Sequence, residues 1–188
     1  MKTCVFITGT NGVGKSSLAL AIIDHYGGID RVTKNVTYCA EGNVCLAGQY
    51  GECRYGGVDR ITNDKGSSCT SMLAEVVEEG LSHADVIFCE GSFMNTFGLN
   101  LTNAMFKANR HLIVSLYSDT TTIHNRIIGR SNGKNGTGKR NWPSIVSRQK
   151  QAMIAARKWQ SIGVKVLQLN TGTMTVEEEL EQVIKTIE

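Results

Sequence analysis

The stretch that decides the fold is Gly9–Ser16, with the sequence GTNGVGKS. It matches the pattern G-x-x-x-x-G-K-[ST], called Walker A, in which glycines let successive backbone N–H groups turn toward phosphate oxygens. An apolar, partly β-branched segment, Lys2–Thr8, precedes it, and a segment of helical composition, Ser16–Tyr26, follows it. Because a strand before the loop and a helix after it are the context that this motif requires, we expect it to bind a nucleoside triphosphate.

Two charged side chains are expected to act on the donor side of this loop. Lys15 is expected to reach the β- and γ-phosphates, and the Ser16 hydroxyl to hold Mg²⁺. Glu90 is the last residue but one of the segment DVIFCEG, Asp85–Gly91, whose apolar part is predicted to pair with the first strand. Glu90 can bind Mg²⁺ through water or act as a base; the alternative is a surface glutamate after a core strand. The full set of expected ATP contacts is Asn11, Gly12, Val13, Gly14, Lys15, Ser16 and Ser17.

The rest of the chain alternates between apolar strands and helices. Strands are predicted at Asp85–Cys89, His111–Tyr117 and Val164–Leu169, with a hairpin at Val36–Tyr50 that turns at Glu41–Asn43. Helices are predicted at Cys69–Leu81, Leu99–Lys107, Thr120–Gly129, Trp142–Gln160 and Val176–Ile187. Pro143 is expected in the first turn of the helix Trp142–Gln160, and a loop is expected over Ser131–Lys139. Strands buried on both faces imply a parallel sheet in a three-layer α/β fold, in one domain over residues 1–188.

Composition excludes some classes of protein and leaves others open. No apolar run is long enough for a transmembrane helix and no signal peptide precedes the first strand, so we expect a cytoplasmic location and no membrane partner. Six cysteines show no C-x-x-C spacing, which favours reduced structural thiols. A metal or redox role for Cys39, Cys45 and Cys53 is the alternative.

Charge is distributed unevenly along the chain. Residues 120–176 hold ten Lys or Arg and no Asp or Glu, whereas the remainder holds ten basic and seventeen acidic residues. This asymmetry suggests a polyanionic partner, either nucleotide phosphates or nucleic acid, although a solvated basic surface is the simpler alternative.

The basic segment contains a predicted lid over residues 126–148. Arg126 and Arg130 lie one helical turn apart, where they can neutralise charge during phosphoryl transfer. Lys139, Arg140 and Arg148 are further candidates, and a flexible solvated loop is the alternative. The turn Asn170–Gly172, after the last predicted strand, is expected to border the adenine base.

A glycine-rich stretch, Leu46–Ile61 (LAGQYGECRYGGVDRI), is predicted to form the acceptor side, within a hairpin and loop region over residues 36–61. A short one-domain chain without a guanine-binding N-K-x-D run fits a phosphotransferase, which needs a carboxylate to receive the acceptor proton. Asp59 is the first candidate for this base, with Glu41 and Asp30 as rivals. Tyr50 and Tyr55 are expected to stack on a base, and Arg54 and Arg60 to contact phosphate. The alternative is a turn-rich loop in which Asp59 caps the next element.

Together these features resemble the phage P-loop kinases that phosphorylate 5-hydroxymethyluracil within DNA. The matching parts are GTNGVGKS, the run LAGQY…YGGVDRI, the strand VIFCEG, the following NTFG, and the lid arginines. The resemblance implies ATP- and Mg²⁺-dependent transfer of the γ-phosphoryl group to a base hydroxymethyl in phage DNA, on the way to hypermodified thymidines. It also implies a viral protein that acts in the infected host cell.

Two other functions stay open. A deoxynucleoside monophosphate kinase would use the same phosphate loop and lid, with Arg54, Arg60 or Arg110 holding the acceptor's monophosphate. A non-catalytic, ATP-regulated binding protein would bind nucleotide without transferring a phosphoryl group. The oligomeric state is not indicated by any pattern.

Overall fold

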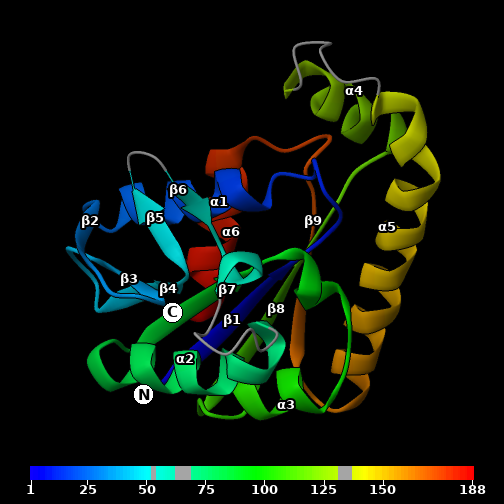
Figure 1. Ribbon diagram of the computed structural model, residues 1–188. Coiled ribbons are helices and arrows are strands. Elements are labelled where there is room, and N and C mark those ends of the chain that lie inside the picture. Colours follow the sequence, from blue (N-terminus) through cyan, green and yellow to red (C-terminus); the bar gives the residue numbers. More distant parts are fainter. Residues whose placement is uncertain (52–53, 62–68, 131–136) are drawn as a thin grey trace.

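The computed structural model describes residues 1–51, 54–61, 69–130 and 137–188 (Figure 1). The side chains of residues 54, 55, 60, 69, 130 and 137–142 are not part of that description. Within the described residues, none of the helices combines the length and the apolar character needed to cross a membrane.

A seven-stranded sheet forms the centre of the molecule, in the order β2-β3-β4-β7-β1-β8-β9. Five strands are parallel: β4 (Val44–Ala47), β7 (Val86–Glu90), β1 (Thr3–Thr8), β8 (Arg110–Tyr117) and β9 (Lys165–Asn170). Two antiparallel strands, β3 (Val36–Cys39) and β2 (Ile29–Val32), complete one edge. The predicted pairing of β7 with β1 is confirmed, and its register sets Glu90 beside Ile7.

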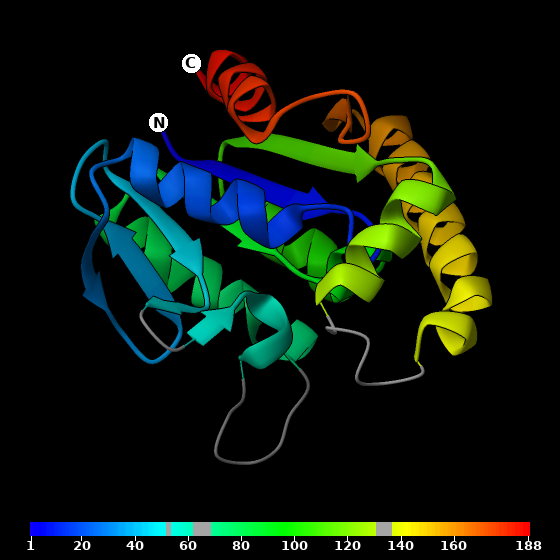
Figure 2. The same cartoon turned by 90° about the horizontal axis from the view of Figure 1, so that it is seen from above.

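Helices cover both faces of this sheet, which confirms the predicted three-layer α/β fold (Figures 1 and 2). The helices α1 (Lys15–His25) and α6 (Val176–Ile187) pack on one face, where β1 contributes Val5 and Ile7. The helices α2 (Cys69–His83), α3 (Leu99–Met105) and α5 (Thr137–Ser161) contribute to the core on the other face, where β1 contributes Cys4 and Phe6. This alternation along β1 follows from the two-residue period of a strand. The remaining helix, α4 (Thr120–Arg130), packs against α5.

The structure corrects the sequence-based elements at two places. An additional exposed strand, β2, lies at the sheet edge; its residues IDRV lack the apolar alternation that marks a strand, and backbone pairing with β3 holds it there. Helix α5 begins at Thr137, so the predicted loop over 131–139 is too long and Pro143 lies in the helix interior instead of the first turn. Proline removes one backbone hydrogen bond, but it does not stop helical turns from preceding it.

The predicted hairpin is confirmed, and its chain continues into a second small sheet. The turn between β3 and β4 uses Gly42 and Asn43, both with positive φ. After β4, the strands β5 (Gln49–Gly51) and β6 (Arg54–Gly56) pair with each other. A short 3₁₀ helix, η1 (Val58–Arg60), follows, and a second one, η2 (Ser92–Asn95), follows β7.

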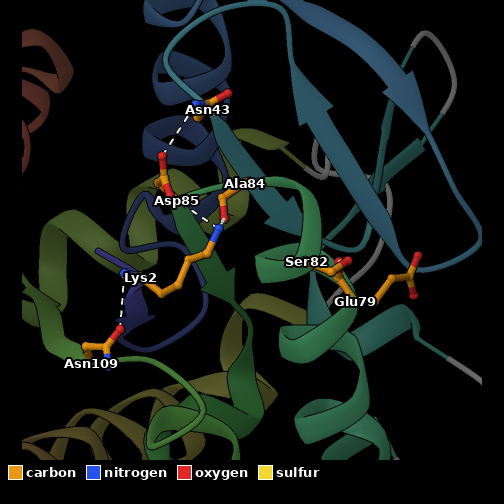
Figure 3. Close-up of polar contacts among 7 residues, drawn as sticks. All are labelled: Lys2, Asn43, Glu79, Ser82, Ala84, Asp85 and Asn109. Atoms are coloured by element: carbon orange, nitrogen blue, oxygen red, sulfur yellow. Dashed lines mark hydrogen bonds and ion pairs between the residues drawn. The ribbon is translucent and has the colours of Figure 1, made fainter.

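The amino ends of the parallel strands meet in a cluster of surface polar contacts (Figure 3). The Lys2 ammonium donates to the carbonyl of Ala84 at 2.7 Å and pairs with the Asp85 carboxylate at 3.2 Å. Asn43 donates to the same carboxylate, and Asn109 accepts from the backbone N–H of Lys2, both at 3.4 Å. These contacts tie β1, β4 and β7 together at the end of the sheet opposite to the phosphate loop.

Candidate active site

The phosphate loop joins β1 to α1 at the carboxyl end of the sheet. Gly14, at the cap position of α1, has φ +109°, in the left-handed region that favours glycine, and no side chain caps the helix start. Gly12 has φ +82°, and a Cβ there would lie 2.7 Å from the side chain of Ile127 in α4. The first N–H groups of α1 are therefore available to an anion, as expected for a phosphate site.

Lys15 lies across this loop and is almost fully buried, with 8% of its surface exposed. Its ammonium donates to the carbonyl oxygens of Gly9 at 2.8 Å and Thr10 at 3.1 Å. A positive charge is thus held directly over the backbone cradle, where a phosphate would be an additional partner for it.

Glu90 is buried at the end of β7, which rules out the alternative of a surface glutamate; 6% of its surface is exposed. Its Oε1 accepts hydrogen bonds from the Ser16 hydroxyl at 3.4 Å and from the Tyr50 hydroxyl at 3.2 Å. Burial raises the pKa of the Glu90 carboxyl, while the nearby charge of Lys15 opposes that rise. Tyr50, which is predicted to stack on a base, is buried here, and its hydroxyl orients the Glu90 carboxyl.

The residues at this point fit a magnesium ion. A hydroxyl and a carboxylate are hard oxygen donors of the kind that Mg²⁺ prefers. Ser16 and Glu90 provide such a pair at 3.4 Å, next to the phosphate loop. A buried carboxylate with few partners is also stabilised by a nearby cation. Ser16 and Glu90 are therefore the residues that would hold Mg²⁺ here.

The predicted acceptor loop packs directly against Glu90. A Cβ on Gly57 would lie 2.3 Å from the Glu90 carbonyl oxygen and 2.5 Å from its Oε1, so only glycine fits this approach. The Asp59 carboxylate accepts the backbone N–H groups of Ser92 at 2.8 Å and Phe93 at 3.3 Å. Asp59 thus caps the first turn of η2. It is also exposed to solvent, so its remaining lone pairs can face an acceptor.

Asn95 is a site residue that sequence reasoning missed. Its side chain accepts from the Gly9 N–H at 2.7 Å and donates to the Gly9 carbonyl at 2.9 Å, and only 3% of its surface is exposed. The Ser92 hydroxyl, also in η2, donates to the Asn11 side chain at 3.0 Å. Helix η2 therefore connects the acceptor loop, through Asp59, to the start of the phosphate loop. The signal was present in the run NTFG, which begins with Asn95.

A cavity of about 430 Å³ opens beside the start of α1. Arg126, from α4, reaches across to the turn after β9, where its guanidinium donates to the Thr171 hydroxyl at 3.0 Å and the Thr171 carbonyl at 2.6 Å. The turn Asn170–Gly172, which is predicted to border the adenine base, lines this cavity through Thr171. The described residues that line it are Val13, Gly14, Ser17, Arg126, Gly129, Thr171, Met174, Val176 and Glu179.

Several other predicted residues lie outside the description or away from the site. The side chains of Arg54, Tyr55, Arg60, Arg130, Lys139 and Arg140 lie outside the described part, and Arg148 is exposed on α5. The rival bases are exposed and lie apart from the phosphate loop: Glu41 follows β3, where its N–H donates to Tyr26 at the end of α1, and Asp30 lies on the edge strand β2. Arg110 begins β8 at the opposite end of the sheet, where its N–H donates to Lys2.

The cysteines that the structure describes lie in the core. Cys4, Cys39, Cys45 and Cys89 are buried and free, and burial raises the pKa of the Cys39 thiol to about 11. Cys53, the third member of the alternative metal or redox group, lies outside the described residues. Across the described ranges, no three His, Cys, Asp or Glu side chains form a group that could hold a metal ion.

No protein-family model and no curated protein sequence matches this chain. Solved structures do match it over nearly its whole length. The YorR protein of Bacillus subtilis, in complex with phosphorylated GDP, is 17% identical with a TM-score of 0.57, covering 98% of this chain and 95% of its own. The deoxyadenosine kinase of M. mycoides, with the products dCMP and dCDP, is 14% identical with a TM-score of 0.52, covering 98% of each chain.

A third match broadens the range of activities found on this fold. The shikimate kinase of Acinetobacter baumannii, in complex with shikimate, is 11% identical with a TM-score of 0.50 and covers 100% of this chain and 93% of its own. Likeness at such low identity shows the architecture and leaves the substrate open. The chain has the fold of the P-loop kinases.

Proposed function

We propose that this protein is an ATP- and Mg²⁺-dependent kinase. The main support is the contact between the two halves of the candidate site. Glu90 lies 3.4 Å from Ser16 on the donor side, and Gly57 of the acceptor loop packs against the same glutamate. A nucleotide on the phosphate loop and an acceptor on the Gly57–Asp59 segment would thus meet at Glu90, which is the positioning that phosphoryl transfer needs.

On the donor side, the N–H groups at the start of α1 and the Lys15 ammonium would bind the phosphates of ATP. Ser16 and Glu90 would hold Mg²⁺, which neutralises phosphate charge when bound. Tyr50 and Ser16 both donate to Glu90, so its carboxyl is oriented before any ligand binds. Lys15 stabilises charge on the transferring group because it is fixed in a buried position.

On the acceptor side, Asp59 is the proposed base. The acceptor oxygen would form a bond to the γ-phosphorus while the bond from that phosphorus to the β-bridging oxygen breaks, leaving ADP. The hydroxyl proton would pass to the Asp59 carboxylate. Two backbone N–H groups hold this carboxylate in place and leave its exposed side open to an acceptor.

The proposed acceptor is the hydroxymethyl group of 5-hydroxymethyluracil in phage DNA, modified in a thymidine hypermodification pathway. The support is the resemblance of GQYGECRYGGVDRI to the phage DNA-base kinases, together with the basic residues over 120–176. Access requires either flipping the base, at a few kcal/mol, or approach from the major groove.

The test is incubation with γ-labelled ATP and duplex DNA that contains 5-hydroxymethyluracil, with thymine DNA of the same sequence as the control. We expect label in the modified DNA only, and no label with the Lys15→Ala variant. An enzyme that turns over ATP with another acceptor but never labels the DNA would disprove the DNA substrate.

A second candidate is a kinase that acts on free nucleotides, such as a deoxynucleoside monophosphate kinase. It is favoured by the likeness to a deoxyadenosine kinase whose structure contains dCMP and dCDP. Of the arginines proposed to hold its acceptor, Arg110 lies at the opposite end of the sheet, which leaves Arg54 and Arg60. A panel of free nucleosides and nucleotides, assayed by ADP release beside the DNA, separates the two candidates.

A further inference from the structure

Glu179, in the first turn of α6, is a buried carboxyl that the proposed transfer step does not use. Only 2% of its surface is exposed, and among the described residues its Oε2 has no hydrogen-bond partner. Leaving a buried carboxyl oxygen unpaired costs free energy, which a ligand with a matching N–H group would offset. The side chain is part of the wall of the 430 Å³ cavity beside the phosphate loop.

The cavity lies where the base of a bound nucleotide would be expected. Val13, Gly14 and Ser17, at the junction of the phosphate loop and α1, form one wall, and the turn and helix after β9 form the opposite one. Its volume falls within the range of small-molecule pockets. Phosphates on the loop would therefore leave the base of the same nucleotide within reach of α6.

Among the side chains that the structure describes, Arg126 and Glu177 are the charged groups that act on Glu179. Arg126 faces it from α4 and is held by two hydrogen bonds to Thr171, while Glu177 lies exposed in the same turn of α6. The other described residues of the cavity wall are uncharged. Burial raises the pKa of Glu179 to about 7, with Arg126 opposing and Glu177 adding to the rise. The protonated side chain can donate one hydrogen bond and accept another.

We propose that Glu179 is a specificity-determining residue that recognises the adenine base of the phosphoryl donor in this cavity. The inference rests on the proposed function, since it takes ATP as the donor. A carboxylic acid offers one O–H and one acceptor oxygen, which match the N1 acceptor and the 6-amino donor of adenine. A carboxylate can only accept, and would match the N1–H and 2-amino group of guanine.

The test measures nucleotide binding without any acceptor, by calorimetry with ATP, ITP and GTP. ITP replaces the 6-amino group by an oxygen. We expect Glu179→Ala to weaken ATP binding about tenfold and to remove the preference for ATP over ITP. Glu179→Gln should keep ATP affinity within about threefold, because an amide also offers one donor and one acceptor. Glu181→Gln, an exposed position of the same helix that is not part of the cavity wall, is the matched control and should change neither.

The pH profile adds an independent readout. Wild-type affinity for ATP should fall as the pH rises above 7, because the carboxyl loses its donor, whereas Glu179→Gln should show a flat profile. Unchanged ATP affinity and base preference in both Glu179 variants, each folded by thermal melting, would overturn the proposal. So would a wild-type preference for GTP that Glu179→Gln abolishes.

Binding and transfer fail in different ways, so the two proposals remain distinguishable. Normal discrimination between ATP and ITP without phosphoryl transfer would remove the kinase and keep the role of Glu179. Phosphoryl transfer from ATP that is unchanged in Glu179→Ala would keep the kinase and remove the role of Glu179. Absence of ATP binding by the wild type would overturn both.

Discussion

At the amino end of the sheet, Lys2 and Asp85 form an ion pair with about 40% of each side chain or more exposed, and neighbouring amides complete their contacts (Figure 3). At the carboxyl end, the charged side chains of Lys15, Glu90 and Glu179 are buried instead. Glu90 is 6% and Glu179 2% exposed, and Thr10, Ser118 and Glu179 each have a buried oxygen that lacks a partner among the described residues.

The contacts at the amino end stabilise the fold, whereas the buried groups at the carboxyl end are placed where a ligand could pair with them. Exposed ion pairs contribute little to the free energy of folding, so the protein loses little stability when one is removed. Buried and incompletely paired groups reduce stability, so their presence is explained when a ligand supplies the missing partner. Five changes test this contrast, and three of them are paired with a matched change elsewhere in the chain.

The largest effect is expected from Lys15→Ala. Without the ammonium over the loop, the transferring phosphoryl group loses its fixed positive charge, and kcat should fall about 10²–10³-fold. Lys2→Ala removes the corresponding charge at the amino end and should leave kcat within about twofold. Steady-state ADP release measures both. Equal losses in the two variants would mean that the two ends do not differ in function.

Asp59→Asn is expected to have the next largest effect. Asparagine keeps a side-chain oxygen that can accept the Ser92 N–H, so η2 should stay capped while the base is lost. Transfer should fall about 10²-fold or more, with ATP affinity nearly unchanged. Asp119→Asn is the matched control, because Asp119 also accepts a backbone N–H, that of Thr122 at 2.8 Å. Unchanged transfer in Asp59→Asn would exclude Asp59 as the base.

Glu179→Gln is expected to change the pH dependence of stability in the ligand-free protein. The pKa of Glu179 rises from 4.5 to about 7 on folding, so its ionisation favours the unfolded chain. Below about pH 4.5 the carboxyl is protonated in both states, and the wild type loses up to about 3 kcal/mol as the pH rises to 7. Urea unfolding should show no such loss for Glu179→Gln. Parallel curves for the two proteins would contradict a buried, unpaired carboxyl.

Asn95→Ala tests the contact between η2 and the phosphate loop. Removal of the side chain leaves the buried N–H and carbonyl of Gly9 without these partners, at a cost of about 1–3 kcal/mol of unfolding free energy. A looser loop should also weaken ATP binding by about tenfold. Asn109→Ala is the matched control at the amino end, where one exposed 3.4 Å contact is lost. Equal ATP affinity in both variants would show that the contact does not organise the loop.

Much of the fold could be predicted from the sequence because its signals are local. The motif GTNGVGKS, between an apolar strand and a helix, predicts the first strand–loop–helix unit. The segment VIFCEG pairs with that strand and places Glu90 at the carboxyl edge of the sheet. Strand β2 was missed because its residues are exposed and its pairing with β3 is a backbone effect. The beginning of α5 was missed because proline favours, but does not require, the first helical turn.

The site was harder to predict because its contacts join distant parts of the chain. Asn95 and Gly9 are 86 residues apart, and Tyr50 and Glu90 are 40 apart. The burial of Tyr50 could not be predicted, since no local pattern shows that its side chain turns into the core. Glu179 did carry a signal: it lies four residues before Val183, on the face of α6 that helical spacing predicts to be buried.

The smallest effect is expected from removing the ion pair at the amino end. Lys2→Ala, Asp85→Asn and the double variant form a double-mutant cycle in which the coupling free energy should be small, because both side chains are partly exposed. The Lys2 ammonium lowers the pKa of the Asp85 carboxyl, so this contribution should be present at neutral pH and disappear as the pH falls through the acidic range. Thermal and urea unfolding at pH 7 and pH 3 measure it. A coupling as large as the Glu179 effect would show that an exposed pair can equal a buried group, and the contrast between the two ends would then fail on energetic grounds.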